Sequence, residues 1–252
     1  MMHSSINFGY PWWLTYGHLP VFAIALILVA AGYFRHWSRW AMAVFGIFAF
    51  WSFSAFLIMR FAIDINGRGS LPTENFFRAG NGRVLDIGAG TGRSTIMVLQ
   101  ARPQSSAVAL DLFGASFDQH FGQGQTPQDR LLANLKAAGV DQRTTITTAD
   151  MLKLPFDPAT FDAIISAYAI DHLNRDGSRI AIGEAARVLK PGGEFLLILI
   201  AKEPWVEYAF GPLIMHTGLR EASWWSEALR ETNFTVIEHR TRPGTRYFLS
   251  RK

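Results

Sequence analysis

Cysteine is absent from this chain of 252 residues. Its absence excludes disulfide bonds, thiolate metal sites and cysteine nucleophiles. Any chemistry must therefore be carried by other side chains, by backbone groups or by a bound cofactor.

Charged residues are missing from two long stretches near the N-terminus. No Asp, Glu, Lys or Arg occurs in residues 1–34, and none occurs in residues 40–59. As helices, residues 12–34 and 40–63 are each long enough to cross a hydrocarbon core about 30 Å thick. Between them lies a short basic segment, residues 35–39. Aromatic side chains flank both ends of the pair, as in membrane-interface belts: Trp12, Trp13, Tyr16, Tyr33, Trp37 and Trp40. Residues 1–63 are therefore expected to form a membrane-anchoring helical hairpin.

Other interpretations of this hairpin stay open. A cleaved signal peptide is disfavoured, because no positive charge precedes the first apolar run and a second run follows it. A buried hairpin in a soluble protein is a second alternative. A hairpin that enters one leaflet without crossing would avoid placing Arg35 and Arg39 outside, against the positive-inside tendency. The expected location is the inner (cytoplasmic) membrane, with the remaining domain in the cytoplasm.

The net charge of +4 and the pI near 9.6 do not indicate a nucleic-acid partner. The Arg and Lys residues are scattered along the chain rather than clustered. An anionic membrane surface explains the basic excess more simply. The expected partners are a lipid bilayer and a lipophilic small molecule, and the oligomeric state is not indicated.

Beyond a Gly- and Pro-containing linker, residues 64–82, strand and helix patterns alternate through residues 83–252. Strands are expected at residues 83–87, 107–112, 144–149, 161–169, 194–201, 234–240 and 246–250. Helices are expected at residues 91–101, 128–138, 178–189 and 224–231. Such alternation is typical of an α/β fold with a doubly wound, mostly parallel sheet, which binds ligands beyond the carboxyl ends of its strands. The last two strands should form an antiparallel hairpin at the sheet edge.

A glycine-rich turn follows the first of these strands. In the sequence R-V-L-D-I-G-A-G-T-G-R-S, residues 83–94, Gly88, Gly90 and Gly92 have no Cβ, so the backbone can turn sharply and a ligand can approach the main chain closely. The spacing is G-x-G-x-G, whereas a dinucleotide fingerprint would need a glycine at Arg93. A smaller ligand with an amine and a carboxylate, such as S-adenosylmethionine, fits better than a dinucleotide.

Five motifs in register resemble the class I S-adenosylmethionine-dependent methyltransferase family. They are V-L-D-I-G-A-G-T-G at 84–92, A-L-D-L at 109–112, A-D-M at 149–151, F-D-A-I-I-S at 161–166 and R-V-L-K-P-G-G at 187–193. The resemblance covers residues 83–250 and implies a Rossmann-like methyltransferase domain that uses S-adenosyl-L-methionine. The hairpin of residues 1–63 is not part of the common family pattern.

The resemblance implies a set of cofactor-binding residues. Asp111 would accept hydrogen bonds from the ribose hydroxyls, and Asp86 would help to hold the methionine amino group, or would simply hold the turn. Asp150 would accept from the adenine amino group, and the adenine ring would lie between two apolar side chains. The full expected set is Asp86, Gly88, Ala89, Gly90, Asp111, Leu112, Asp150, Met151 and Ser166, with Ser166 near the sulfonium and no metal.

Candidate catalytic residues follow the fourth strand in S-A-Y-A-I-D-H-L. Methyl transfer from a sulfonium depends largely on positioning, so a strong catalytic signature is not required. An acceptor that loses a proton could give it to Asp171 or His172, with Tyr168 nearby. A purely structural role in the loop is the alternative. His120 and His216 are expected to be incidental.

Two apolar stretches, residues 113–126 and 202–225, are expected beside the cofactor. They hold Phe113, Phe117, Phe121, Trp205, Tyr208, Phe210, Leu213, Ile214, Met215, Trp224 and Trp225. Such surface would form a lipophilic acceptor site, dock on a membrane or pack into the core. We expect a membrane-anchored methyltransferase for a phospholipid amine, a quinone-type ring or another hydrophobic molecule. A methyltransferase for small thiols or sulfide and a non-catalytic cofactor-binding membrane protein remain as alternatives.

Overall fold

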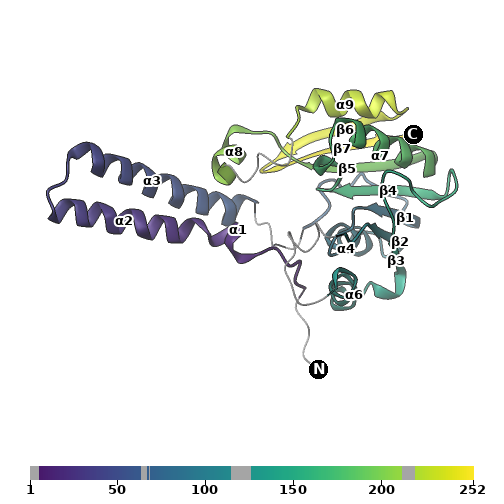
Figure 1. Cartoon of the computed structure of the whole chain (residues 1–252). Coiled ribbons are helices and arrows are strands. Elements are labelled where there is room, and N and C mark those ends of the chain that lie inside the picture. Colours follow the sequence, from purple (N-terminus) through teal and green to yellow (C-terminus); the bar gives the residue numbers. More distant parts are fainter. Residues whose placement is uncertain (1–5, 64–66, 68, 115–125, 212–218) are drawn as a thin grey trace. The chain divides into compact units, whose positions relative to one another are not determined.

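The computed structural model describes residues 6–63, 67, 69–114, 126–211 and 219–252 (Figure 1). The chain divides into two compact units, which we describe separately. The sheet unit comprises Met1–Gly9, Arg68–Lys202 and Met215–Lys252, and the apolar unit comprises Tyr10–Gly67 and Glu203–Ile214. These ranges differ from the expected domains in two respects: residues 1–9 group with the sheet, and residues 203–214, from the later part of the chain, group with the hairpin.

The sheet unit is built on a seven-stranded sheet with the order β3-β2-β1-β4-β5-β7-β6. Strands β1 to β5 pair in parallel, and β7 is antiparallel to both β5 and β6. This topology confirms the expected mostly parallel sheet with a closing hairpin at one edge. The strands are β1 (Asn81–Ile87), β2 (Gln104–Asp111), β3 (Thr144–Thr148), β4 (Phe161–Ala167), β5 (Leu189–Ile200), β6 (Thr235–Arg242) and β7 (Thr245–Arg251).

Four longer helices accompany the sheet: α4 (Arg93–Ala101), α6 (Pro127–Ala138), α7 (Arg175–Val188) and α9 (Ala222–Glu231) (Figure 1). Local sequence sets their ends. Thr126 caps α6 by accepting from the Asp129 amide, with Pro127 at the first helical position, and Gly139 ends this helix in the left-handed conformation. Asn174 caps α7 by accepting from the Gly177 amide at 2.8 Å. Two 3₁₀ turns, η2 (Asp141–Arg143) and η3 (Ile170–His172), complete the unit.

Alternate strand residues face two separate cores. Leu85 and Ile87 of β1 pack with α7 and α9, whereas Val84 packs with Met97 and Val98 of α4. Strand residues of a buried parallel sheet are apolar on both faces for this reason. The expectation of a linker over residues 64–82 is wrong for part of this range. Phe76 is buried in the α4-side core, and the Arg102 guanidinium donates to the Phe76 and Phe77 carbonyls. This part of the range is therefore packed within the sheet unit.

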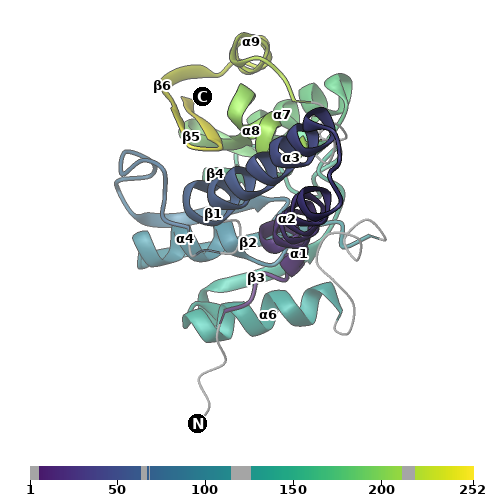
Figure 2. The same cartoon turned by 90° about the vertical axis from the view of Figure 1, so that its left-hand side faces the viewer.

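The apolar unit contains α1 (Trp12–Tyr16), α2 (His18–Phe34), α3 (Arg39–Leu57), the π-helical turn η1 (Ile58–Ile63) and α8 (Pro204–Phe210). Helices α2 and α3 lie side by side, and the Phe22 and Phe53 ring centroids are 5.0 Å apart (Figure 2). The basic segment forms the connection, in which the Trp37 amide donates to the Gly32 carbonyl and Ser38 caps α3.

The first expected span is interrupted. The helical run of residues 12–34 breaks at Gly17, and Pro20 has no N–H to bond the carbonyl four residues earlier. Among the described residues, Arg39–Ile63 is the one helix with the length and composition to cross a membrane, and His18–Phe34 is a shorter apolar helix. The expectation of two full spans is therefore not met, and one such helix is weak evidence for a membrane location.

Candidate cofactor and acceptor site

The glycine-rich turn after β1 has the backbone that its sequence predicts. Gly88, Gly90 and Gly92 have φ values of 75°, 53° and 91°, which residues with a Cβ rarely adopt. A Cβ on Gly88 would lie 2.2 Å from the Ala169 Cβ, and one on Gly92 would lie 2.6 Å from Leu131 of α6. The glycines therefore allow both the reversal and its close packing at the carboxyl ends of β1 and β4.

The amides of the turn already have partners. Gly88 and Ala89 both donate to the Leu110 carbonyl, at 2.8 and 2.9 Å, and Gly90 donates to the Asp111 carboxylate at 2.9 Å. These bonds tie the turn to the end of β2. The amides of Gly88 and Ala89 thus hold the turn in place, and the absence of a Cβ at Gly88 and Gly92 lets Ala169 and Leu131 pack closely against it.

Asp111 ends β2 and faces the turn. Its second oxygen accepts from the Phe113 amide at 3.0 Å, and Phe113 has a φ of 48°, a strained conformation for a residue with a Cβ. A carboxylate has about four acceptor positions, so Asp111 retains capacity for ligand hydroxyls. The neighbouring Leu112 side chain is 57% exposed, so an apolar surface stands beside the carboxylate.

Asp150 and Met151 follow β3 at the same edge. The Asp150 carboxylate is exposed and accepts from the Leu152 amide at 2.8 Å, an Asx turn that orients the loop. The Met151 methyl group lies 3.4 Å from the position that a Cβ on Gly88 would occupy. The structure therefore brings Met151 to the glycine-rich turn.

Asp86 is completely buried at the end of β1. Its carboxylate accepts from the Ser94 hydroxyl at 2.7 Å and from the Thr95 hydroxyl at 2.5 Å, both at the start of α4. Burial raises the pKa of Asp86 to about 6, against the opposing effect of these hydroxyls, and the Asp111 charge raises it further. In this geometry Asp86 holds the turn onto α4, which is the structural role that the sequence left open.

Ser166, near the end of β4, is also fully buried. Its hydroxyl donates to the Ile87 carbonyl at 2.8 Å and so links β4 to the last residue of β1. In the structure Ser166 fixes the spacing of these strands, and its expected place near a sulfonium stays a prediction.

The three candidate catalytic residues lie between β4 and α7. Tyr168 has a φ of 53°, and its hydroxyl lies 2.6 Å from the Thr245 hydroxyl of β7. Burial raises the pKa of Tyr168, which favours the neutral phenol. His172 is exposed. Only Asp171 of the three is both buried and acidic.

Asp171 is 5% exposed, and its two carboxylate oxygens differ. Oδ2 accepts from the Ile200 amide at 3.1 Å, whereas Oδ1 is buried with no hydrogen-bond partner among the residues that the structure describes. Burial raises the pKa of Asp171 above its usual range, although the nearby charges of His172 and Arg220 oppose this effect. A buried carboxylate with a raised pKa and one oxygen without a hydrogen-bond partner is a candidate proton acceptor.

Arg220 and two tryptophans cover this region. The Arg220 guanidinium donates to the Leu173 carbonyl and lies 4.8 and 5.2 Å from the ring centroids of Trp224 and Trp225. Arg175 and Arg179 also lie within 6.0 Å of the Trp224 ring. Burial lowers the pKa of Arg220. These contacts place aromatic surface and positive charge near Asp171.

Sequence reasoning missed the partners of the site residues. Ser94 and Thr95 are visible only as two hydroxyls directly after the turn, and nothing in their spacing identifies Asp86 as their acceptor. Thr245 and Arg220 come from distant parts of the chain. His120 and His216, Phe117, Phe121 and residues 213–215 lie outside the described residues.

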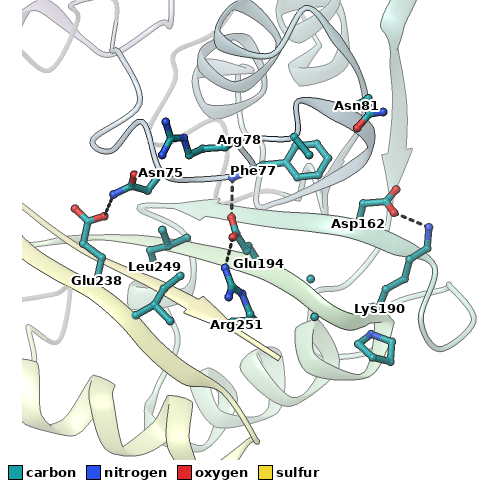
Figure 3. A pocket seen from close by; sticks show the side chains of 15 residues that line it. Asn75, Phe77, Arg78, Asn81, Asp162, Lys190, Glu194, Glu238, Leu249 and Arg251 are labelled. Atoms are coloured by element: carbon teal, nitrogen blue, oxygen red, sulfur yellow. Dashed lines mark hydrogen bonds and ion pairs between the residues drawn. The ribbon is translucent and has the colours of Figure 1, made fainter.

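A separate cavity of about 640 Å³ lies at the other edge of the sheet, by the start of β4 and the end of β7 (Figure 3). Four of its charged residues form two ion pairs. Lys190 bonds Asp162 at 2.6 Å, and Arg251 bonds Glu194 at 3.0 Å (Figure 3). The cavity is far in the topology from the glycine-rich turn, so we do not assign the cofactor to it.

S-adenosylmethionine fits the residues at the carboxyl edge. Asp111 has acceptor positions beyond those used by the Gly90 and Phe113 amides, and Leu112 and Met151 offer apolar surface for a planar base. Asp150 would complete the adenine end. Cofactor contacts for the individual residues stay predictions.

Comparisons with known proteins agree with this geometry. Residues 84–193 match the family model described as "Methyltransferase domain". A ubiquinone/menaquinone biosynthesis C-methyltransferase, UbiE, of Rhizobium leguminosarum is 34% identical over 117 residues, which are 46% of this chain and 40% of that protein. The O-methyltransferase rstn1 of Aspergillus nomiae is 30% identical over 162 residues, 62% of this chain and 65% of that protein. The chain thus spans about half the length of the curated relatives it matches.

A solved structure of an O-methyltransferase family protein from Burkholderia thailandensis shares the fold. Its TM-score is 0.59 at 17% identity, and the match covers 95% of this chain and 69% of that one. The sheet order, the glycine-rich turn and these matches agree: residues 84–193 are similar to methyltransferase domains, and the sheet unit has a Rossmann-like methyltransferase fold.

Proposed function

We propose that the chain is a methyltransferase that acts on a lipophilic acceptor drawn from a bilayer, with a quinone-type or phenolic ring as the favoured class. The observation that carries the proposal is the apolar unit, which presents a large exposed apolar surface and includes a helix from within the methyltransferase domain. The names of the relatives, which include quinone-biosynthesis and O-methyltransferases, support a ring acceptor.

The exposed apolar surface runs over both hairpin helices. Side chains there include Phe34, Trp40 and Phe50, which are 78%, 84% and 74% exposed. Monomeric soluble proteins rarely expose contiguous apolar surface of this extent, and such surface marks membrane or partner contact. The aromatic residues expected at the two interfaces are all partly or well exposed, which supports contact with headgroups.

Helix α8 supports delivery of the acceptor from the membrane. It begins four residues after the end of β5 and belongs to the apolar unit. Within that unit, the Trp51 indole donates to the Tyr208 carbonyl at 3.0 Å, and the Ser54 and Tyr208 hydroxyls lie 2.6 Å apart. Polar contacts thus fasten α8, which follows β5 in the chain, to the hairpin.

The chemistry divides between the cofactor and the chain. When bound, S-adenosylmethionine supplies an electrophilic methyl group. Asp171 Oδ1 would accept the proton that a phenol or enol loses, and the Tyr168 hydroxyl would donate to the acceptor oxygen if it exchanged its bond to Thr245. Holding the acceptor and the methyl group in line supplies most of the rate enhancement, on the order of 7–11 kcal/mol for well-oriented reactants.

The test uses the full chain in detergent with S-adenosylmethionine labelled in its methyl group and a total membrane lipid extract. The proposal predicts label in the organic phase, and predicts its loss in Asp171→Asn. Asp162→Asn is the matched control, because Asp162 is a surface carboxylate paired with Lys190 at the opposite edge. Label that enters only small thiols, or no acceptor at all, would overturn the proposal in favour of the thiol or the non-catalytic alternative.

A further inference from the structure

A short N-terminal segment, residues 7–9, lies on the glycine-rich turn; we refer to it as the strap. Asn134 of α6 accepts from the Asn7 amide at 2.9 Å and donates to the Asn7 carbonyl at 3.0 Å. The Thr91 hydroxyl donates to the Phe8 carbonyl at 3.0 Å. Phe8 is 3% exposed, and the Arg93 guanidinium lies 5.8 Å from its ring centroid. The strap is therefore bound by residues of the turn itself and of the helix that follows β2.

Asn134 joins the strap to the turn. Besides its two bonds to Asn7, its amide group donates to the Thr91 carbonyl at 2.9 Å, and the side chain is 3% exposed. Both polar atoms of Asn134 are used in these bonds. Thr91 follows Gly90 directly, so a change in the strap reaches the backbone that shapes the cofactor site.

The strap is continuous with the hairpin. Gly9 has a φ of 78°, and its amide donates to the Asn7 side chain at 2.8 Å, a turn that ends the strap. Only Tyr10 and Pro11 separate Gly9 from the start of α1 at Trp12.

We propose that Phe8 and Asn134 are positioning residues for S-adenosylmethionine, acting through the glycine-rich turn, so that a bound strap favours cofactor binding. The inference rests on the proposed function only for the identity of the cofactor. Linkage is reciprocal, so a strap that favours cofactor binding is itself held more firmly when the cofactor is bound.

Two physical consequences follow. Loss of the Phe8 ring or of the Asn134 amide would let the turn sample other conformations, and the fraction of chains competent to bind would fall. Because neither residue is assigned to the reacting groups, turnover at saturating cofactor would change little. The signature is a raised KM for the cofactor with a nearly unchanged kcat.

The experiment compares full-chain variants by calorimetric titration with S-adenosylhomocysteine. Phe8→Ala and Asn134→Ala are each expected to weaken binding about five- to thirtyfold, the range for a lost contact of this kind. Phe8→Leu, which keeps most of the apolar bulk, should restore part of the affinity. Ile180→Ala, a truncation of an exposed apolar side chain of α7, should leave it unchanged. Circular dichroism melting verifies that each variant is folded.

Hydrogen exchange supplies a second readout that a merely structural role would not change. Saturation with S-adenosylhomocysteine should slow exchange of the Asn7 amide, which donates to Asn134, in the wild-type chain. Unchanged affinity in both folded variants, or Asn7 exchange that does not respond to the ligand, would overturn the inference. Neither measurement needs an acceptor substrate. The role of the strap can therefore be refuted while the proposal of a lipophilic acceptor holds, and the proposal of a lipophilic acceptor can be refuted while the role of the strap holds.

Discussion

Asp86 gives the sharpest prediction about stability. Its carboxylate is fully buried, and burial raises its pKa from 3.8 to about 6. The folded chain therefore holds this proton more tightly than the unfolded chain does. The free energy of unfolding should fall as pH rises from about 4 to about 6 and should then level off. Above both pKa values, the Asp86 carboxyl is ionised in the folded chain and in the unfolded chain alike.

The magnitude follows from the two pKa values. Each pH unit between them corresponds to about 1.4 kcal/mol, so the ionised carboxylate lowers stability by about 3 kcal/mol at neutral pH. Asp86→Asn removes this destabilisation, because the amide carries no charge. The amide oxygen of the variant can still accept from Ser94 and Thr95. We expect the variant to be more stable than the wild type at neutral pH by up to about 3 kcal/mol. The cost of burying the new amide N–H groups without partners reduces this gain.

The assay is urea unfolding of the full chain in detergent, followed by tryptophan fluorescence across the acid and neutral range. Asp162→Asn is an opposing control. The Arg83 amide and Lys190 outweigh the effect of burial and lower the Asp162 pKa, so its contribution to stability is present at neutral pH and is lost on acidification. Two results would refute the reasoning. One is a wild-type free energy of unfolding that rises between pH 4 and 6 by an amount that Asp86→Asn removes. The other is an Asp86→Asn chain that is less stable than the wild type at neutral pH.

Two further predictions concern the site. Gly88→Ala should abolish cofactor binding and lower the melting temperature, because its Cβ would meet Ala169 at 2.2 Å. The control Gly139→Ala has a similar φ of 69° but open space around the Cβ, so it should lower stability by only about 1–2 kcal/mol of backbone strain. Equal losses of stability in the two variants, measured by calorimetry, would contradict the role of the clash. Asp171→Asn should remove the acid limb of the profile of kcat/KM against pH. In the wild type that limb should lie above the usual carboxyl range, and a limb retained by the variant would assign it to another group.

Much of the sheet unit could be predicted because its signals are local. Apolar runs and glycine turns alternate, so the positions of the strands and of the four longer helices followed, usually within a few residues. The need for glycine at residue 88 also followed from the turn alone. The positions of Asp111 and Asp150 at strand ends likewise required only the strand pattern.

The remaining features depend on contacts between distant residues. Asn7 and Asn134 are 127 positions apart, and no periodicity connects them. The grouping of α8 with the hairpin rests on Trp51 and Tyr208, 157 positions apart. The partners of Asp86 were missed for another reason: whether a carboxylate at a strand end faces the ligand or a neighbouring helix is decided by the packing of α4.

Calorimetric titration of S-adenosylmethionine into the full chain and into Asp111→Ala tests the central claim most directly. The account predicts that the wild-type chain binds the cofactor, and that loss of the carboxylate at the end of β2 weakens binding by about 1–3 kcal/mol, which is roughly five- to 160-fold in affinity. Asp162→Ala, at the opposite edge of the sheet, should bind like the wild type. Equal affinity in Asp111→Ala and the wild type would contradict the placement of the cofactor at this edge.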